Sequence, residues 1–413
     1  MNKADELLNR GGQQLRSGNL ASAYESWQRA ASLYERAKDS TGLMKAHLNL
    51  GSVARMQGRA NDALGHFKSA LDLANTYGDS VTEAKAAMGI GSVYAAAGRP
   101  LDSLGWYARS LKLTEGDELT PANVTALIKF NIGHAMLAIG QVTTALANFS
   151  ESVDIARQHP EDFDVADLIA AMDSVGLCYT YLRQPERALP AHDEAISMAQ
   201  RNGFKIEALN ARGNRALALS RLNRHTEATS VLHAVVEEAR KIGVIHSELQ
   251  ATILLCEVLG QARQDMNEAK LFAERAVILA AGIDERARSV ALNTLGTIEF
   301  KRGDLLKAAE AFRASLQIKR RIGDKRGTAG TLANLGVVEI HRQEIVEGLE
   351  VLWRDLACAQ CTEIVAATRR SCSRAPIGRI ARVIVDCAGR IRNDKAGQAG
   401  LLHLMSEHPL SGG

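Results

Sequence analysis

Apolar residues recur along the chain at helical spacing, and a short phrase that ends in an apolar residue and a glycine returns at regular intervals. The phrase reads AHLNLG at 46–51, AMGIG at 87–91 and KFNIG at 129–133. The glycines aligned on it are Gly11, Gly51, Gly91, Gly133, Gly176, Gly296 and Gly336. They stand about forty residues apart, or a near multiple of forty, and such a period predicts a solenoid of stacked units.

A second pattern accompanies the glycines. Twelve residues after most of them comes a small residue, and a bulky residue follows four positions later. The pairs are Ala23 and Trp27, Ala63 and Phe67, Ser103 and Tyr107, Ala145 and Phe149, Ala188 and His192, and Ala308 and Phe312. This spacing predicts two antiparallel helices per unit. The first carries the glycine, and the second begins near the small residue.

Glycine is a costly residue at these helical positions. In a helix interior it is about 1 kcal/mol less favourable than alanine. A chain that repeats it must gain from a close approach of another helix, where a side chain would clash. We therefore expect the glycines and small residues to be contacts between paired helices, and the bulky residues to fill the space between neighbouring pairs.

Together the two patterns resemble those of the tetratricopeptide repeat (TPR) family, W-x2-L-G-x2-Y followed by A-x3-F and a proline. The match recurs six or seven times within residues 5–353, with degenerate units around Ala228 and Ala269. The resemblance implies an all-α fold, an α-α superhelix of about nine helical hairpins over residues 1–353. The proline is mostly missing and the period exceeds the usual 34 residues, as in the similar long-period Pins/LGN-like adaptors and kinesin light chains. Connectors such as Gly78-Asp79 and Gly323-Asp324 accompany the longer helices.

The resemblance also implies a binding surface, because the first helices of stacked hairpins line a concave face. Asparagines stand directly before the apolar-glycine pair at Asn49, Asn131 and Asn334, and Asn214 is the proposed equivalent in the sixth unit. In resembling proteins such asparagines hydrogen-bond the backbone of an extended peptide, since an amide both donates and accepts. The alternative is that they are solvated or bond to an adjacent helix.

Further groove positions are predicted from the same register. They are Lys45, Arg55, Met56, Lys85, Met88, Phe130, His134, Asp173, Tyr181, Leu217, Arg221 and Lys301. Cations outnumber the single carboxylate here, and apolar groups lie between them. We therefore predict an extended or helical peptide partner that alternates acidic and apolar residues; a solvated, mildly basic groove without this preference is the alternative.

Catalytic motifs are missing from the sequence. GIGSVY at 89–94 begins like a dinucleotide loop but lacks the third glycine, and no Walker loop, H-E-x-x-H or G-x-S-x-G occurs. The histidines are scattered, and those in second helices are expected at surfaces or interfaces. We predict a non-catalytic scaffold or adaptor with no cofactor, metal or small-molecule substrate. The rival function is a TPR regulatory sensor that responds to a ligand.

Composition changes after Trp353. Four of the six cysteines follow it, at Cys358, Cys361, Cys372 and Cys387. C-x2-C suggests zinc, but the second pair lacks that spacing. We predict basic amphipathic cap helices over 354–395 and a disordered tail over 396–413. The arginine-rich face of 378–391 keeps RNA or an anionic membrane open as a further alternative.

The remaining features bear on location. The first residues contain no apolar signal region, and no run approaches the ~18 apolar residues needed to cross a bilayer. Six cysteines in 413 residues do not indicate a disulfide framework. The net charge of +3 is too small to indicate nucleic acid by itself. We expect a cytoplasmic protein, and the oligomeric state is left open.

Overall fold

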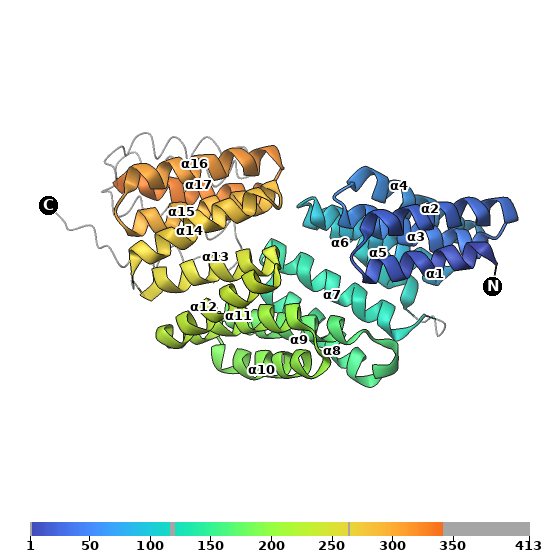
Figure 1. Cartoon of the computed structure of the whole chain (residues 1–413), viewed down its shortest axis with the longest axis horizontal. Helices are drawn as coiled ribbons and strands as arrows, with labels where there is room; N and C mark the ends of the chain where they lie inside the picture. Colours follow the sequence, from blue (N-terminus) through green and yellow to red (C-terminus); the bar gives the residue numbers. More distant parts are fainter. Residues whose placement is uncertain (1, 116–119, 263–264, 342–413) are drawn as a thin grey trace, which may run out of the picture. The chain divides into compact units, whose positions relative to one another are not determined.

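The computed structural model describes residues 2–115, 120–262 and 265–341 (Figure 1). Within these ranges the chain forms seventeen α-helices and no strand, which confirms the predicted all-α fold. The predicted cap helices over 354–395, the tail over 396–413 and the four clustered cysteines lie outside the described residues, as does the end of the ninth predicted hairpin.

The helices follow the predicted alternation of first and second helices. First helices are α1 (Lys3–Arg16), α3 (Ser40–Met56), α5 (Ser80–Ala96), α7 (Ala122–Ile139), α9 (Val165–Tyr181), α11 (Lys205–Arg221), α13 (Ile245–Ala262), α15 (Glu285–Lys301) and α17 (Lys325–His341). Second helices are α2 (Leu20–Ala37), α4 (Ala60–Tyr77), α6 (Pro100–Thr114), α8 (Val142–Gln158), α10 (Pro185–Asn202), α12 (His225–Ile242), α14 (Met266–Ala281) and α16 (Leu305–Arg321). A short 3-10 helix, Pro160–Asp162, follows α8.

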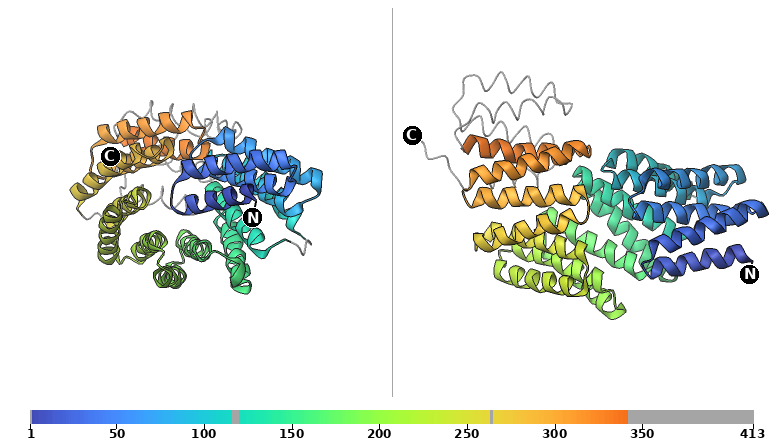
Figure 2. Two further views of the ribbon diagram at one scale, coloured as in Figure 1. Left: turned by 45° about the vertical axis from the view of Figure 1, so that its right-hand side comes forward. Right: turned by 45° about the horizontal axis from the view of Figure 1, so that its top comes forward.

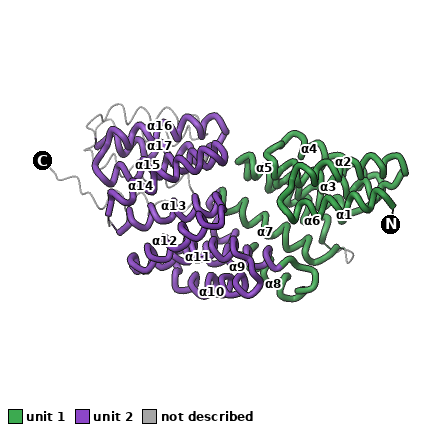
Figure 3. The backbone as a smooth tube through the Cα atoms, in the orientation of Figure 1, with its two compact units in different colours: residues 1–138, 147–164 green, residues 139–146, 165–413 purple. Residues whose placement is uncertain are grey.

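The chain divides into two compact units (Figure 3). One comprises residues 1–138 and 147–164, and the other comprises residues 139–146 and those from 165 onward. In the second unit α9, α11, α13 and α15 contact one another in sequence, so the first helices of successive hairpins form a continuous row. Figure 2 shows the helices of this unit, green to orange, as successive layers.

The Gly-Asp connectors end one helix and begin the next. Gly78 terminates α4 in the left-handed conformation, φ +70°, which glycine adopts without a Cβ penalty. The Asp79 carboxylate then accepts a hydrogen bond from the backbone N–H of Thr82 at 2.9 Å and caps the start of α5. Asp324 accepts from Gly327 in the same way at 2.8 Å. Two residues thus suffice to reverse the chain between hairpins.

The repeated glycines lie against the bulky residue of their own hairpin, which confirms that they are helix contacts. Nearest ring atoms would lie 2.8 Å from a Cβ at Gly51, 2.6 Å at Gly91 and Gly133, and 2.7 Å at Gly176 and Gly296. The rings concerned are Phe67, Tyr107, Phe149, His192 and Phe312. Each of these bulky residues therefore packs against the glycine of its own hairpin. Phe67 also packs between hairpins, since a Cβ at Gly89 of α5 would collide with its ring.

Helix α7 is the one described helix whose length and composition would allow it to cross a membrane. It nevertheless packs as a repeat helix, because the Phe149 ring covers Gly133 and the Ser152 hydroxyl donates to the Ala126 carbonyl at 2.9 Å. Its apolar side chains Val124, Ile128 and Ile132 are buried in the first unit. These contacts are those of a solenoid core helix.

Candidate functional site

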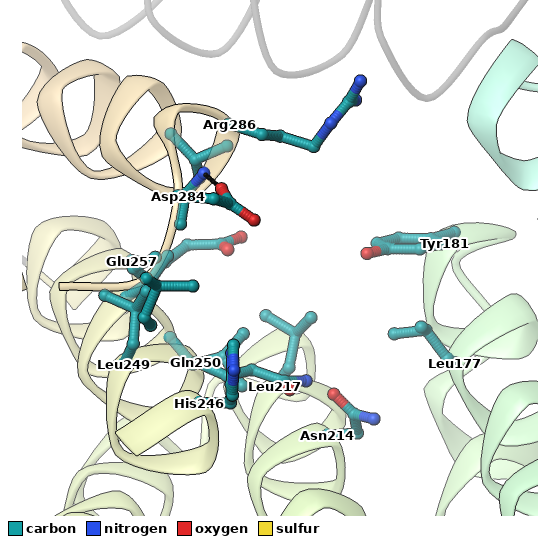
Figure 4. A pocket seen from close by; sticks show the side chains of 15 residues that line it. Leu177, Tyr181, Asn214, Leu217, His246, Leu249, Gln250, Glu257, Asp284 and Arg286 are labelled. Atoms are coloured by element: carbon teal, nitrogen blue, oxygen red, sulfur yellow. Dashed lines mark hydrogen bonds between the residues drawn. The ribbon is translucent and has the colours of Figure 1, made fainter. Parts of the chain in front are cut away.

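The first helices of the second unit enclose an open groove (Figure 4). Its cavity volume is about 480 Å³. Side chains from α9, α11 and α13 line it, together with the residues that lead into α15 and the first turns of that helix. Four successive hairpins therefore contribute to one surface, which lies on the row of first helices.

The lining is mainly apolar and also includes polar groups. The apolar members are Leu177, Tyr181, Leu217, Leu249, Ile253, Leu254, Ile283, Ala287 and Val290. The polar members are Asn214, His246, Gln250, Glu257, Asp284 and Arg286. Figure 4 shows Leu177 and Tyr181 on one side of the cavity and Glu257 and Asp284 on the other. Such a surface can bury apolar side chains while amide and charged groups meet polar ones.

Asn214 is held at the groove by a buried network. Its Nδ2 donates to Asp173 Oδ2 at 2.7 Å, and the buried ring of His192 donates from Nδ1 to Asp173 Oδ1 at 2.6 Å. The amide oxygen of Asn214 points toward the cavity and its nitrogen away from it (Figure 4). One carboxylate thus receives two donors from neighbouring helices and fixes which end of the amide faces the cavity.

The charged groups of the groove differ in the interactions that they already make within the protein. Glu257 accepts from Arg221 and from Gln261, each at 3.0 Å. Asp284 caps α15 by accepting from the Ala287 N–H at 2.6 Å. The Arg286 guanidinium has no hydrogen bond or ion pair among the described residues, and it reaches across the cavity (Figure 4). It is the lining cation available to an incoming anion.

The predicted groove residues of the second unit fall into two groups. Tyr181, Asn214 and Leu217 line the groove. Asp173 accepts a hydrogen bond from Asn214, and Arg221 contacts the groove through Glu257. Lys301 donates from Nζ to the Gly260 carbonyl at 2.8 Å, and Asn334 donates to Asn293 at 3.4 Å, each a bond to the adjacent first helix. The polar ends of this second group are engaged within the protein.

The predicted residues of the first unit lie on α3, α5 and α7. Lys45 and Arg55 are exposed, and Asn49 and Lys85 are half-buried. Residues 130, 131 and 134 follow on α7.

On α7 the ring centroids of Phe130 and His134 are 4.5 Å apart, and Phe130 also meets Phe149 at 5.6 Å. Asn131 donates to the Leu127 carbonyl of its own helix at 2.8 Å. Phe130 and His134 therefore belong to a local aromatic cluster, and the Asn131 amide bonds within its own helix.

Sequence reasoning missed the contribution of α13 and of the turn before α15. His246, Gln250 and Glu257 were not predicted, because this hairpin lacks the apolar-glycine phrase on which the register was set. The forty-residue period could have located this part of the groove, since Leu254 stands forty residues after Asn214 and lines the groove.

Comparisons with known proteins agree with this architecture. Residues 4–76 match the family model of the tetratricopeptide repeat, and no curated protein matches the sequence. A Rap protein complexed with Competence and Sporulation Factor aligns with a TM-score of 0.55 at 14% identity, covering 84% of this chain and 99% of that one. The apo form of RapI gives 0.55 at 15% identity, covering 68% and 98%.

A third similar structure is the Rap conjugation gene regulator of the plasmid pLS20 in complex with the Phr* peptide. Its TM-score is 0.53 at 14% identity, covering 90% of this chain and 98% of that one. At such identities the likeness concerns the fold. The tetratricopeptide repeat match over residues 4–76 and the same alternation of first and second helices in the later hairpins together give this chain the fold of a tetratricopeptide-repeat-like solenoid.

Proposed function

We propose that this protein is a non-catalytic interaction scaffold that binds a peptide segment of a partner in the groove of α9, α11, α13 and α15. The observation that carries the proposal is the groove itself, an open cavity of about 480 Å³ on the first helices of four successive hairpins. Two of the similar structures support it, since one is a complex with Competence and Sporulation Factor and another with the Phr* peptide.

The lining suggests how a peptide is held. Leu177, Ile253 and Val290 offer apolar surface, worth about 25 cal/mol per Å² that a ligand covers. The Asn214 amide oxygen can accept a hydrogen bond from a peptide N–H, and the exposed Gln250 amide can pair with a peptide group in either sense. Main-chain pairing tolerates different ligand side chains, while the apolar surface selects among them.

The charge of the lining suggests a preference within the ligand. Glu257 is already paired with Arg221, whereas Arg286 is available. We therefore propose a segment that places an acidic residue beside Arg286 and apolar residues along α11 and α13. This keeps the acidic-apolar partner expected from the sequence but assigns its recognition to an arginine that the sequence register did not single out.

A matched pair of substitutions tests the site. Peptides selected from a random displayed library on the full chain would be synthesised and their binding measured by calorimetry. Val290→Glu places a charge in the groove at a residue that is 42% exposed and is expected to weaken binding at least tenfold. Ile278→Glu, 73% exposed on α14 and outside the groove, is expected to change it less than twofold. Equal affinity of the Val290→Glu protein and the unaltered chain would reject the site.

A second candidate function is a ligand-responsive regulator. It is favoured by the similarity to a conjugation gene regulator in its peptide complex. Small-angle scattering of the full chain with and without a selected peptide separates the two functions. A sensor is expected to change its radius of gyration on binding, and an unchanged value assigns the protein to passive scaffolds.

A further inference from the structure

Two histidines of the first unit face each other outside the groove. His47 on α3 and His66 on α4 approach with their Nδ1 atoms 3.2 Å apart and their ring centroids at 5.4 Å. Both rings are half-buried, so the pair is shielded but reachable from solvent. No sequence motif connects these two histidines, because they lie in different helices of one hairpin.

The separation of the two nitrogens is compatible with two imidazole ligands on one tetrahedral metal ion. With Zn–N bonds of about 2.05 Å and a tetrahedral angle, two imidazole nitrogens on one zinc ion lie about 3.3 Å apart. In a square-planar site of the same bond length, cis nitrogens lie about 2.9 Å apart. The observed 3.2 Å is nearer the tetrahedral value. It also permits one N–H···N hydrogen bond that holds the rings in place before a metal arrives.

The far nitrogen of His66 already has a hydrogen-bond partner. Its Nε2 lies 3.0 Å from the Tyr24 hydroxyl, and the Arg59 guanidinium stacks on the Tyr24 ring at 4.1 Å. When Nε2–H donates to the hydroxyl oxygen, the lone pair of His66 is on Nδ1, directed at His47. Ligating histidines commonly have such a partner on their second nitrogen, which fixes the tautomer.

The surroundings keep both rings in the form that binds metals. Burial lowers the pKa of His47 below its ordinary value of 6.5; His66 lowers it further and Glu35 opposes this. Burial also lowers the pKa of His66, where Asp62 opposes and Arg59 reinforces the effect. Burial thus favours the neutral form of both rings, and neutral imidazole is the ligand form.

We propose that His47 and His66 bind one zinc ion through their Nδ1 atoms, with water completing a tetrahedral coordination. Binding requires the proton of His47 to move from Nδ1 to Nε2. This is a change of tautomer, so the neutral pair loses no proton. Because the ligands come from both helices of one hairpin, the ion would join α3 to α4.

The test uses the full chain with zinc chloride alone as the probe, under reducing conditions at neutral pH. Calorimetry is expected to show a site whose affinity falls at least tenfold in His47→Gln and in His66→Gln. Tyr24→Phe is expected to weaken it about tenfold, because the second-nitrogen partner is removed. Replacement of zinc by Co²⁺ is expected to give the intense visible absorption of a tetrahedral ion.

Competing zinc sites are separated by matched variants. His159, Glu161 and Asp162 place exposed ligand atoms within 4.8 Å of one another, and the cysteines after residue 357 are a further source. His159→Gln and a variant with those cysteines replaced by serine are expected to keep the His47–His66 site. Should zinc binding disappear only in these controls, or persist in His47→Gln and His66→Gln, the proposal is wrong. Zinc-induced shifts of the two Nδ1 resonances in the unaltered protein decide the matter if a variant fails to fold.

Discussion

Replacing Gly91 by valine is expected to lower the free energy of unfolding of the first unit by about 3 kcal/mol. A Cβ at this position would lie 2.6 Å from the Tyr107 ring and 3.2 Å from the Ser103 carbonyl oxygen. Tyr107 is 1% exposed and the carbonyl belongs to the backbone of α6, so neither can move aside without separating α5 from α6. The better helix propensity of valine offsets only a few tenths of a kcal/mol.

Gly105 provides the matched control for that substitution. It lies inside α6, and an added Cβ there would meet no atom within 4 Å. Gly105→Ala is expected to stabilise the unit by about 0.5–1 kcal/mol, because the substitution reduces the backbone conformational entropy lost on folding and creates no clash. Urea unfolding followed by circular dichroism measures both variants. A Gly91→Val protein as stable as the unaltered chain would contradict the role of these glycines as helix contacts.

Asp173→Ala is expected to destabilise the second unit by about 3 kcal/mol and to weaken peptide binding in the groove. The substitution leaves the donor of buried His192 and that of Asn214 without their acceptor. The His192 ring has no space to find another, since it is fully buried against Gly176 and its Nε2 already lacks a partner among the described residues. Thermal unfolding and calorimetry with a selected peptide measure the two effects.

A swap of side chains distinguishes lost hydrogen bonds from lost volume. Asp173→Asn alone is expected to cost about 2 kcal/mol, because its amide nitrogen would face the donor of Asn214. Adding Asn214→Asp restores the pairing, since the new carboxylate accepts from residue 173 while the carbonyl of residue 173 accepts from His192. The double variant is expected to recover at least half of the loss. If it is no more stable than Asp173→Asn, the network does not act through donor and acceptor matching.

The hairpins could be predicted because their signal is periodic and steric. Gly133 and Phe149 stand sixteen residues apart in sequence, and that spacing alone places one opposite the other across a tight helical pair. Such a contact depends on side-chain volume and on the length of the repeat, and both can be read from a single sequence.

The chemistry of the groove was less predictable because it depends on neighbouring hairpins. Which end of the Asn214 amide faces the groove depends on where Asp173 of α9 lies relative to α11, and that offset is set by packing. Lys301 likewise reaches the Gly260 carbonyl at the end of α13 instead of facing outward. A carbonyl left unpaired at a helix end attracts a nearby cation, but nothing in the repeat phrase shows that it is within reach.

The Phe67 ring packs against Gly51 on one side and Gly89 on the other. This double contact restricts where such a chain can gain or lose a repeat. Removing or inserting a unit between α4 and α5 would separate Phe67 from Gly89. The ring would then face a helix without that glycine, or Gly89 would face a helix without that ring. A gain or loss of repeats is therefore tolerated at this junction only when the newly adjoining helix also carries a glycine at the position of Gly89.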